Sequence, residues 1–124
     1  MEKINRDSII NLSNIGVISR QLLTLENSES KRVTITEVHL EPGACQPRHL
    51  HKESEQIWYA LQGTGKLLLA ENKEEIFTAG DVVRFEEKDI HGLLNVGNEE
   101  FIYISVTAPP INFEYAYKHK SVNS

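Results

Sequence analysis

The sequence predicts a single all-β domain, built as an antiparallel sandwich or barrel. The chain has 124 residues, which is enough for one domain and too short for two. Short runs rich in β-branched and aromatic residues recur about every eight to twelve residues, with glycine and asparagine turns between them. No pattern of helical period competes over more than a short stretch, and no internal repeat is visible.

The expected strands follow one another closely along the chain. The run RVTITEVHL at residues 32–40 is the clearest, because β-branched side chains fit a pleated surface. Pro42-Gly43 and Gly63-Thr64-Gly65 supply turn chemistry. The full set of expected strands is 17–25, 32–40, 47–51, 56–62, 66–70, 75–78, 82–85, 91–96 and 100–107.

The barrel is assigned to residues 16–110, with both chain ends outside it. Residues 1–15 could form a short helix capped by Asp7 or Ser8, or an arm that pairs with another subunit. At the other end, residues 111–124 form a tail with a possible short helical turn, which could cover the barrel mouth or pack on a partner subunit. The last six residues of this tail are expected to be frayed.

Composition narrows the classes of partner and the compartment. The net charge is −5 and there is no basic cluster, which argues against binding nucleic acid or an anionic membrane surface. The single cysteine, Cys45, excludes an intramolecular disulfide and fits a reducing compartment. The N-terminus lacks the apolar core of a signal peptide, and no apolar run is long enough to span a bilayer. We therefore expect a cytoplasmic protein.

Three histidines and one oxygen donor form a candidate metal site. His49 and His51 are two residues apart, so on a strand they point to the same side. A hairpin would bring Gln56 or Glu55 beside them, and His91 supplies a third imidazole. This set suits a divalent transition metal such as iron, manganese, nickel, copper or zinc. The alternative is that the histidines are hydrogen-bonded core residues, but the combination of all four side chains favours metal binding.

The same residues resemble the two sequence motifs of the cupins, a family of small β-barrel proteins. The first motif is glycine, five residues, His-x-His, three or four residues, Glu, six residues and glycine, and it reads here Gly43, His49, His51, Gln56 and Gly63. The second is glycine, five residues, Pro-x-Gly, two residues, His, three residues and Asn, and it reads here Gly80, Glu86-Glu87-Lys88, His91 and Asn95. The resemblance covers roughly residues 34–110 and implies a double-stranded β-helix, or jelly-roll, cupin barrel.

The chain departs from the motifs at two places. Gln56 stands where the cupins have glutamate, so a bound metal would keep its full charge, with lower affinity and higher Lewis acidity. Glu55 fits the shorter spacing of the motif and is the rival ligand, although the six residues before Gly63 favour Gln56. Glu86-Glu87-Lys88 replaces Pro-x-Gly, which affects the shape of the turn but leaves His91 in place.

Strand alternation also predicts which residues line a pocket beside the metal. Side chains two apart share a face, so the neighbours of the candidate ligands by that rule should point inward with them. Cys45 is expected there as a small buried residue. A mostly apolar pocket with a few polar groups is typical of small-molecule sites. The predicted pocket residues are Cys45, Trp58, Phe85 and Leu93.

For function, we expect a metal-dependent enzyme that acts on a small oxygenated metabolite. The resemblance implies dioxygenase-like or isomerase-like chemistry, among which the fold alone does not choose. Sugar-phosphate isomerases are disfavoured because Arg48 and Arg84 are expected to face away from the lumen. Glu55 is a weak candidate for a general base, if it turns inward. The alternative is a non-catalytic cupin module that binds a small molecule.

A homodimer is the expected assembly. The cupin resemblance implies pairing, and an antiparallel sandwich has edges that need cover. On the strand at residues 100–107, either Ile102 and Ile104 or Phe101 and Tyr103 must face away from the interior. Together with the N-terminal arm, these side chains would offer an apolar surface for a two-fold interface.

Overall fold

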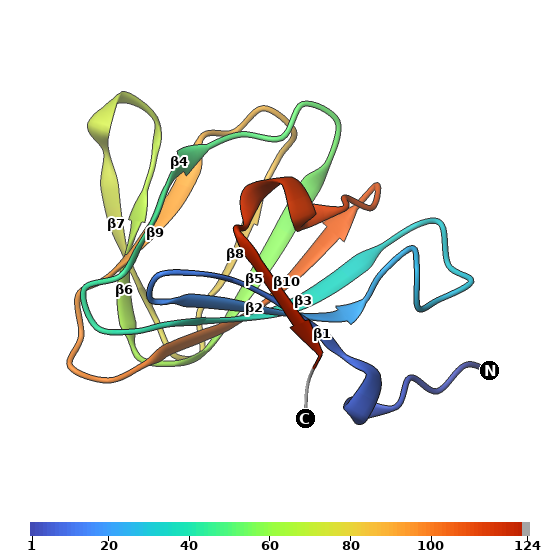
Figure 1. Cartoon of the computed structure of the whole chain (residues 1–124). Coiled ribbons are helices and arrows are strands. Elements are labelled where there is room, and N and C mark those ends of the chain that lie inside the picture. Colours follow the sequence, from blue (N-terminus) through green and yellow to red (C-terminus); the bar gives the residue numbers. More distant parts are fainter. Residues whose placement is uncertain (123–124) are drawn as a thin grey trace.

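The computed structural model describes residues 1–122, which form two antiparallel sheets that face each other (Figure 1). The larger sheet has the order β11-β1-β2-β3-β10-β5-β8, with β11 at His119–Val122, β1 at Ile10–Asn14, β2 at Val17–Leu23, β3 at Thr34–Leu40, β10 at Phe101–Ala108, β5 at Glu55–Gln62 and β8 at Val82–Phe85. The smaller sheet has the order β4-β9-β6-β7, with β4 at Cys45–His49, β9 at His91–Asn95, β6 at Thr64–Leu68 and β7 at Glu74–Thr78. The predicted fold class, an all-β double-stranded β-helix, is confirmed.

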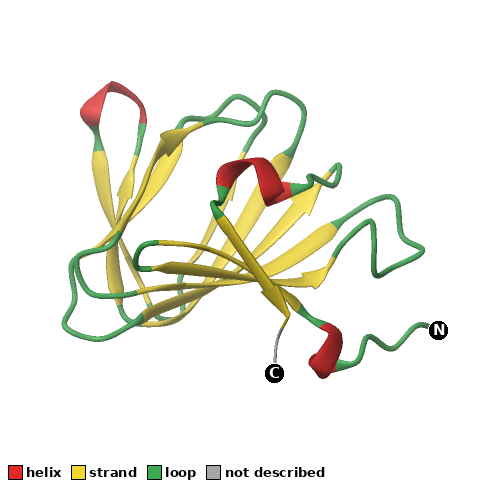
Figure 2. Ribbon diagram, in the orientation of Figure 1, coloured by secondary structure: helices red, strands yellow, loops and turns green. Residues whose placement is uncertain are grey.

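Helical structure in the described residues is limited to short 3-10 turns (Figure 2). These are η1 at Arg6–Ser8, η2 at Ala70–Asn72 and η3 at Phe113–Ala116. Within residues 1–122, no helix is long and apolar enough to cross a membrane.

The core lies between the two sheets and is built by strict alternation along the central strands. On β10, every second residue from Phe101 is buried, and β3 shows the same pattern from Thr34. Aromatic rings fill the space between the sheets, and the rings of Trp58 and Tyr103 lie 4.4 Å apart. Burying one such large apolar side chain stabilises the fold by roughly 1.5–3 kcal/mol. Ile102 and Ile104 therefore face outward, which settles the choice that the sequence left open.

All nine expected strands are present, with ends that shift by a few residues, and the two chain ends add strands to the larger sheet. Residues 10–14 form β1, in which Leu12 is buried, so the helix considered for this segment does not form. β11 pairs with β1 through Ile10 and Val122. The expectation of a frayed tail is therefore wrong for residues 119–122, while residues 123 and 124 lie outside the described part of the chain.

A bulge between β4 and β9 sets the position of the first histidine. Gln46 lies opposite Leu93 and His49 lies opposite His91, so three steps on β4 match two on β9. Gly92 makes this close approach feasible, because a Cβ there would lie 2.6 Å from the Gln46 carbonyl oxygen. Strand backbones therefore meet at this point more tightly than any other residue would allow.

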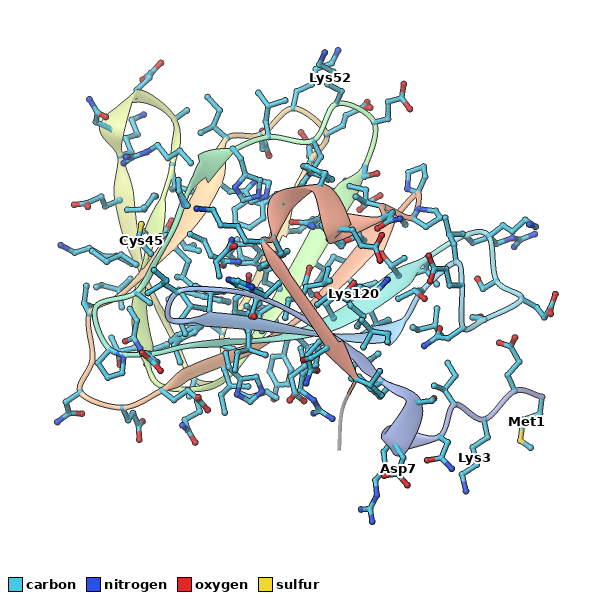
Figure 3. All side chains as sticks on the ribbon, viewed as in Figure 1. Met1, Lys3, Asp7, Cys45, Lys52 and Lys120 are labelled. Carbon is cyan, nitrogen blue, oxygen red and sulfur yellow. The ribbon has the colours of Figure 1, made fainter. Side chains whose placement is uncertain are left out.

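The bulge also changes which side chains of β4 point inward. Simple alternation from His49 predicted that the Cys45 side chain points to the same, inner face. The extra residue in the bulge turns the side chains that precede it to the opposite faces, so Cys45 points outward. Cys45 is therefore exposed, on the smaller sheet, as Figure 3 shows. The expectation that Cys45 is buried is wrong, and Gln46 takes the inward position, where it accepts a hydrogen bond of 2.6 Å from the Tyr103 hydroxyl.

Candidate metal centre

Three imidazoles meet at one end of the barrel. His49 ends β4, His51 follows it in the loop, and His91 begins β9. One ligand nitrogen of each lies within 4.8 Å of the others, and the ring centroids are 4.4–5.3 Å apart. His51 and His91 are buried, whereas His49 is exposed. The predicted histidines are thus brought together, close enough for one cation to be shared after small side-chain adjustments.

Hydrogen bonds to backbone carbonyls orient two of the rings. The Nδ1 atoms of His49 and His91 lie 2.8 Å from the carbonyl oxygens of Pro47 and Asp89. A carbonyl only accepts, so each Nδ1 carries the proton and each Nε2 presents its lone pair. The Nε2 of His51 is buried and has no partner among the described residues. Buried polar atoms without partners are rare, which makes this nitrogen a candidate ligand atom.

Gln56 directs its carbonyl oxygen at the histidines. The Trp58 indole Nε1 donates to Gln56 Oε1 over 3.2 Å, and Gln56 Nε2 donates to Thr107 Oγ1 over 2.9 Å. Because an indole nitrogen only donates, this orientation of the amide is fixed. Gln56 Oε1 then lies 3.1 Å from His91 Nε2. Two lone pairs face each other across this gap, and only a cation or a proton between them makes the contact favourable.

Burial keeps these imidazoles neutral. Burial, together with the nearby His49, lowers the pKa of His51 to about 4. Burial also lowers the pKa of His91 to about 4, although the hydrogen bond with the Asp89 carbonyl acts in the opposite direction. At neutral pH, His91 therefore carries no second proton to place between its Nε2 and Gln56. A metal cation fits that position and the neutral imidazole ligands around it.

Glu55 lies on the other face of β5. Its carboxylate accepts a 2.9 Å hydrogen bond from Arg84 Nε on the outer surface. Of the two rival oxygen donors, Gln56 is thus the one inside the barrel. Glu55 is not placed to act as a general base at this site, which corrects the weak candidacy given to it from the sequence.

The turn that replaces Pro-x-Gly links the two histidine segments. Glu86 N donates to Asp89 Oδ2 over 2.8 Å, and Lys88 adopts a positive φ of 70°. Lys88 N then donates to the carbonyl oxygen of His51 over 2.7 Å. Ordinary residues thus make a turn that ties His51 to the start of β9. Asn95 is structural, because its Nδ2 donates to the Leu40 carbonyl over 3.0 Å.

A cavity of about 360 Å³ runs from the histidines into the barrel. Of the predicted pocket residues, Trp58 and Cys45 line it, and Cys45 is exposed. Phe85 and Leu93 are not among the described lining residues: the Phe85 ring stacks on His91, with centroids 4.4 Å apart, and Leu93 is buried in the core. The sequence analysis missed the polar part of the wall. The polar lining residues it did not name are Asn14, Ser19, Thr36, Gln46, Ser105, Tyr115 and Tyr117.

The C-terminal tail lines the cavity through Phe113, Tyr115, Ala116 and Tyr117. Phe113 of η3 meets the His51 ring edge-on, with centroids 6.1 Å apart. Asn14 at the end of β1 holds the tail, since its Nδ2 donates to the Ala116 carbonyl and its Oδ1 accepts from Lys118 N. The tail therefore forms part of the site, as the lid considered from the sequence would.

Comparison with known proteins supports this architecture. Residues 36–107 match the family model of the cupin domain. An uncharacterized protein of Methanocaldococcus jannaschii is 29% identical over 99 residues, which are 80% of this chain and 78% of that protein.

Among solved structures, the polyketide cyclase RemF from Streptomyces resistomycificus has a TM-score of 0.75 at 20% identity, over 88% of this chain and 80% of its own. A predicted oxalate decarboxylase from Thermotoga maritima has a TM-score of 0.73 at 23% identity, over 86% and 98%. KdgF from Halomonas sp. has a TM-score of 0.70 at 19% identity, over 80% and 84%. These similarities show a shared fold.

Proposed function

This chain belongs to the cupin domain family, and on that premise we propose that it is a metal-dependent cupin acting on a small oxygenated molecule in the barrel cavity. The metal ligands are His49, His51, His91 and Gln56. The observation that carries the proposal is the 3.1 Å contact between two lone-pair atoms, His91 Nε2 and Gln56 Oε1. The unpartnered His51 Nε2 points to the same conclusion.

The residues around the cavity favour redox chemistry over isomerisation. An isomerase needs a group that moves a proton on the substrate, and no aspartate, glutamate or lysine is among the described lining residues. The lining histidines are assigned to the metal, and burial raises the pKa of Tyr103 and of Tyr117. A divalent transition metal would supply a Lewis acid for ligand oxygen atoms and, with iron, manganese or copper, a route for electrons to dioxygen. Dioxygenase-like activity is therefore the first candidate. The amide ligand Gln56 leaves the metal its full charge, which favours oxygen-donor substrates.

A binding module without turnover is the second candidate. The lack of a carboxylate base in the described lining favours it as well. The solved neighbours include a polyketide cyclase and a predicted oxalate decarboxylase, so this fold accommodates very different reactions. Substrate-dependent oxygen uptake separates the two candidates: uptake supports the enzyme, and recovery of a tightly bound, unchanged ligand supports the module.

Metal content tests the proposed site directly. Protein purified without a metal-affinity column is expected to hold about one divalent transition metal per chain by elemental analysis. His91→Ala and His49→Ala should lose it, since each removes an imidazole ligand. His39→Ala is the matched control, because His39 lies on the outer sheet face between Glu37 and Glu100. Retention of the metal in both site variants would place it elsewhere and end the proposal.

We propose that two copies pair through the outer face of the larger sheet. Ile57, Tyr59 and Leu61 point outward from β5 with exposed fractions of 38%, 45% and 44%. Charges on this face are already paired, as in the Arg84–Glu55 contact, so a second copy meets an apolar surface without an unpaired charge. Tyr59→Lys should shift the protein to monomers in sedimentation at micromolar concentration. A wild-type monomer under the same conditions would contradict the dimer.

We also propose that the protein works in the cytoplasm. Cys45 is a free, exposed thiol, which fits a reducing compartment. Cell fractionation tests this, and recovery from a secreted or periplasmic fraction would contradict it.

A further inference from the structure

The cavity wall away from the histidines is a row of small polar side chains. Ser105 of β10 pairs with Thr36 of β3, and Ser19 of β2 lies opposite Val38, one same-face step from Thr36. All three line the cavity and are buried. Residues in direct register lie about 5 Å apart between neighbouring strands and diagonal neighbours about 7–8 Å apart, so the three hydroxyl groups form a row. This row lies at positions where a closed core would carry apolar residues.

Ser105 in this row has an unsatisfied hydroxyl. Its side chain lines the cavity, the residue is only 3% exposed, and its Oγ has no hydrogen-bond partner among the described residues. A buried hydroxyl without a partner destabilises the folded state. A protein that gained nothing from this hydroxyl would be more stable with alanine there. The hydroxyl is therefore available to a group that enters the cavity.

The surrounding wall is uncharged. Gln46 accepts from the Tyr103 hydroxyl, and the Tyr117 hydroxyl lies 3.5 Å from Gln46 Nε2. Burial raises the pKa of Tyr103 and of Tyr117, so both phenols stay neutral. Arg48 is the one arginine or lysine among the described lining residues, and its Nε donates to the carbonyl oxygen of Leu69 over 2.8 Å. A charged ligand group at this wall would find no counter-charge.

Strand geometry gives the distance from this wall to the metal centre. Thr107 holds Gln56 by a hydrogen bond and lies one same-face step beyond Ser105 on β10. Two residues along a strand span about 7 Å. A ligand whose oxygen is anchored beside Gln56 would place a second oxygen at Ser105 if about five heavy atoms separate the two oxygens, at about 1.3 Å of projected length per bond.

We propose that the Ser105–Thr36–Ser19 row is a second ligand subsite, which binds an uncharged hydroxyl about 7 Å from the atom that the metal centre holds. The ligand class is a small hydroxylated acid or a comparable molecule with one anchoring oxygen group and one neutral hydroxyl at its far end. A ligand with anionic groups at both ends is disfavoured. The anchoring end rests on the proposed function, whereas the hydroxyl preference rests on the wall alone.

Three probe acids test this subsite on the cobalt(II)-loaded protein by calorimetric titration. They share a chain length and differ at the far end: 5-hydroxypentanoate, pentanoate and glutarate. We expect 5-hydroxypentanoate to bind about three- to tenfold more tightly than pentanoate, because one neutral hydrogen bond contributes about this factor to affinity. Glutarate should bind the most weakly, because its second carboxylate would lie at the uncharged wall.

Ser105→Ala should reduce the preference for 5-hydroxypentanoate to less than about twofold while leaving the affinity for pentanoate unchanged. Thr36→Val removes a neighbouring hydroxyl at constant volume and should have a smaller effect in the same direction. Ser13→Ala is the control, since Ser13 pairs with exposed Ile18 on the outer face. A purely structural role for Ser105 would lower thermal stability and leave the preference intact.

Three outcomes overturn the subsite: equal binding of 5-hydroxypentanoate and pentanoate, an unchanged preference in Ser105→Ala, or no measurable binding of 5-hydroxypentanoate. A separate cobalt titration without acid tests the proposed function. If the protein binds cobalt but shows no preference for the hydroxylated acid, the subsite proposal alone is contradicted. If the protein prefers the hydroxylated acid but binds no cobalt, the metal proposal is contradicted and the subsite proposal is supported.

Discussion

Replacing the amide ligand by a carboxylate, Gln56→Glu, should tighten metal binding. The structure accepts the change without losing a donor: Trp58 Nε1 still donates to the retained oxygen, and the Thr107 hydroxyl turns from acceptor to donor. The new oxygen replaces an NH₂ group of nearly the same size in a site that is 4% exposed. The change is therefore one of charge rather than shape.

The size of the effect follows from two opposing energies. A unit negative charge about 4 Å from a divalent cation gains roughly 8 kcal/mol at an effective dielectric constant of about 20. Taking the carboxylate out of water costs several kcal/mol. A net gain of about 1.5–3 kcal/mol corresponds to a ten- to hundredfold lower dissociation constant.

Competition with a chromophoric chelator measures this constant for zinc or cobalt(II). Glu55→Gln is the matched control, because it makes the reverse charge change at the neighbouring residue, on the outer face. Its metal affinity should equal that of the wild type. The reasoning is refuted if Gln56→Glu binds the metal no more tightly than the wild type, or if Glu55→Gln weakens binding by a comparable factor.

Three further predictions concern the supports of the site. Gly92→Ala should lower the free energy of unfolding by about 1–3 kcal/mol, and metal affinity with it, because the new Cβ would lie 2.6 Å from a β4 carbonyl oxygen. Gly97→Ala is the control, because its Cβ would meet nothing closer than 3.4 Å, and chemical denaturation should show a smaller loss in the free energy of unfolding. Equal losses in the two variants would contradict this explanation. In metal-free protein, the free energy of unfolding should fall as pH drops from about 6.5 to about 4. In this window the unfolded chain takes up protons on His51 and His91, whereas the folded chain does not, because each pKa is lowered to about 4. A free energy of unfolding in urea that stays constant over this window would refute the prediction. Phe113→Ala should raise the pKa of His51 toward 6.5 by opening the mouth to water, which imidazole NMR titration would show.

Local pattern predicted most of the barrel because each strand carries its own evidence. On β3, side chains alternate between buried and partly exposed as the sequence alternates, so the inward face could be assigned in advance. The six-residue spacing to Gly63 favoured Gln56 over Glu55 as the inward residue, and in the structure Gln56 is buried while Glu55 pairs with Arg84. The alternation rule failed for Cys45, since a one-residue bulge reverses parity without any local mark in the sequence.

The chain ends show the other limit of local pattern. β11 is a strand because it pairs with β1 at the opposite end of the chain, as between Val122 and Ile10, and β1 pairs on its other side with β2. Neither segment has strong strand propensity by itself, and tertiary pairing decides its state. The polar row of Ser105, Thr36 and Ser19 was missed for a related reason: three ordinary residues on three strands become a surface only when the register aligns them.

The sequence by itself determined the β class and three histidines with an oxygen donor that could share a cation. These follow from spacing, because two-residue periodicity and the distances between motif residues are properties of the local chain. Only the tertiary structure decided that Gln56 aims its oxygen at His91, that residues of the tail line the cavity, that both chain ends join the larger sheet, and that Cys45 is exposed. Each of these depends on contacts between distant segments, whose register and hydrogen bonds no local pattern contains.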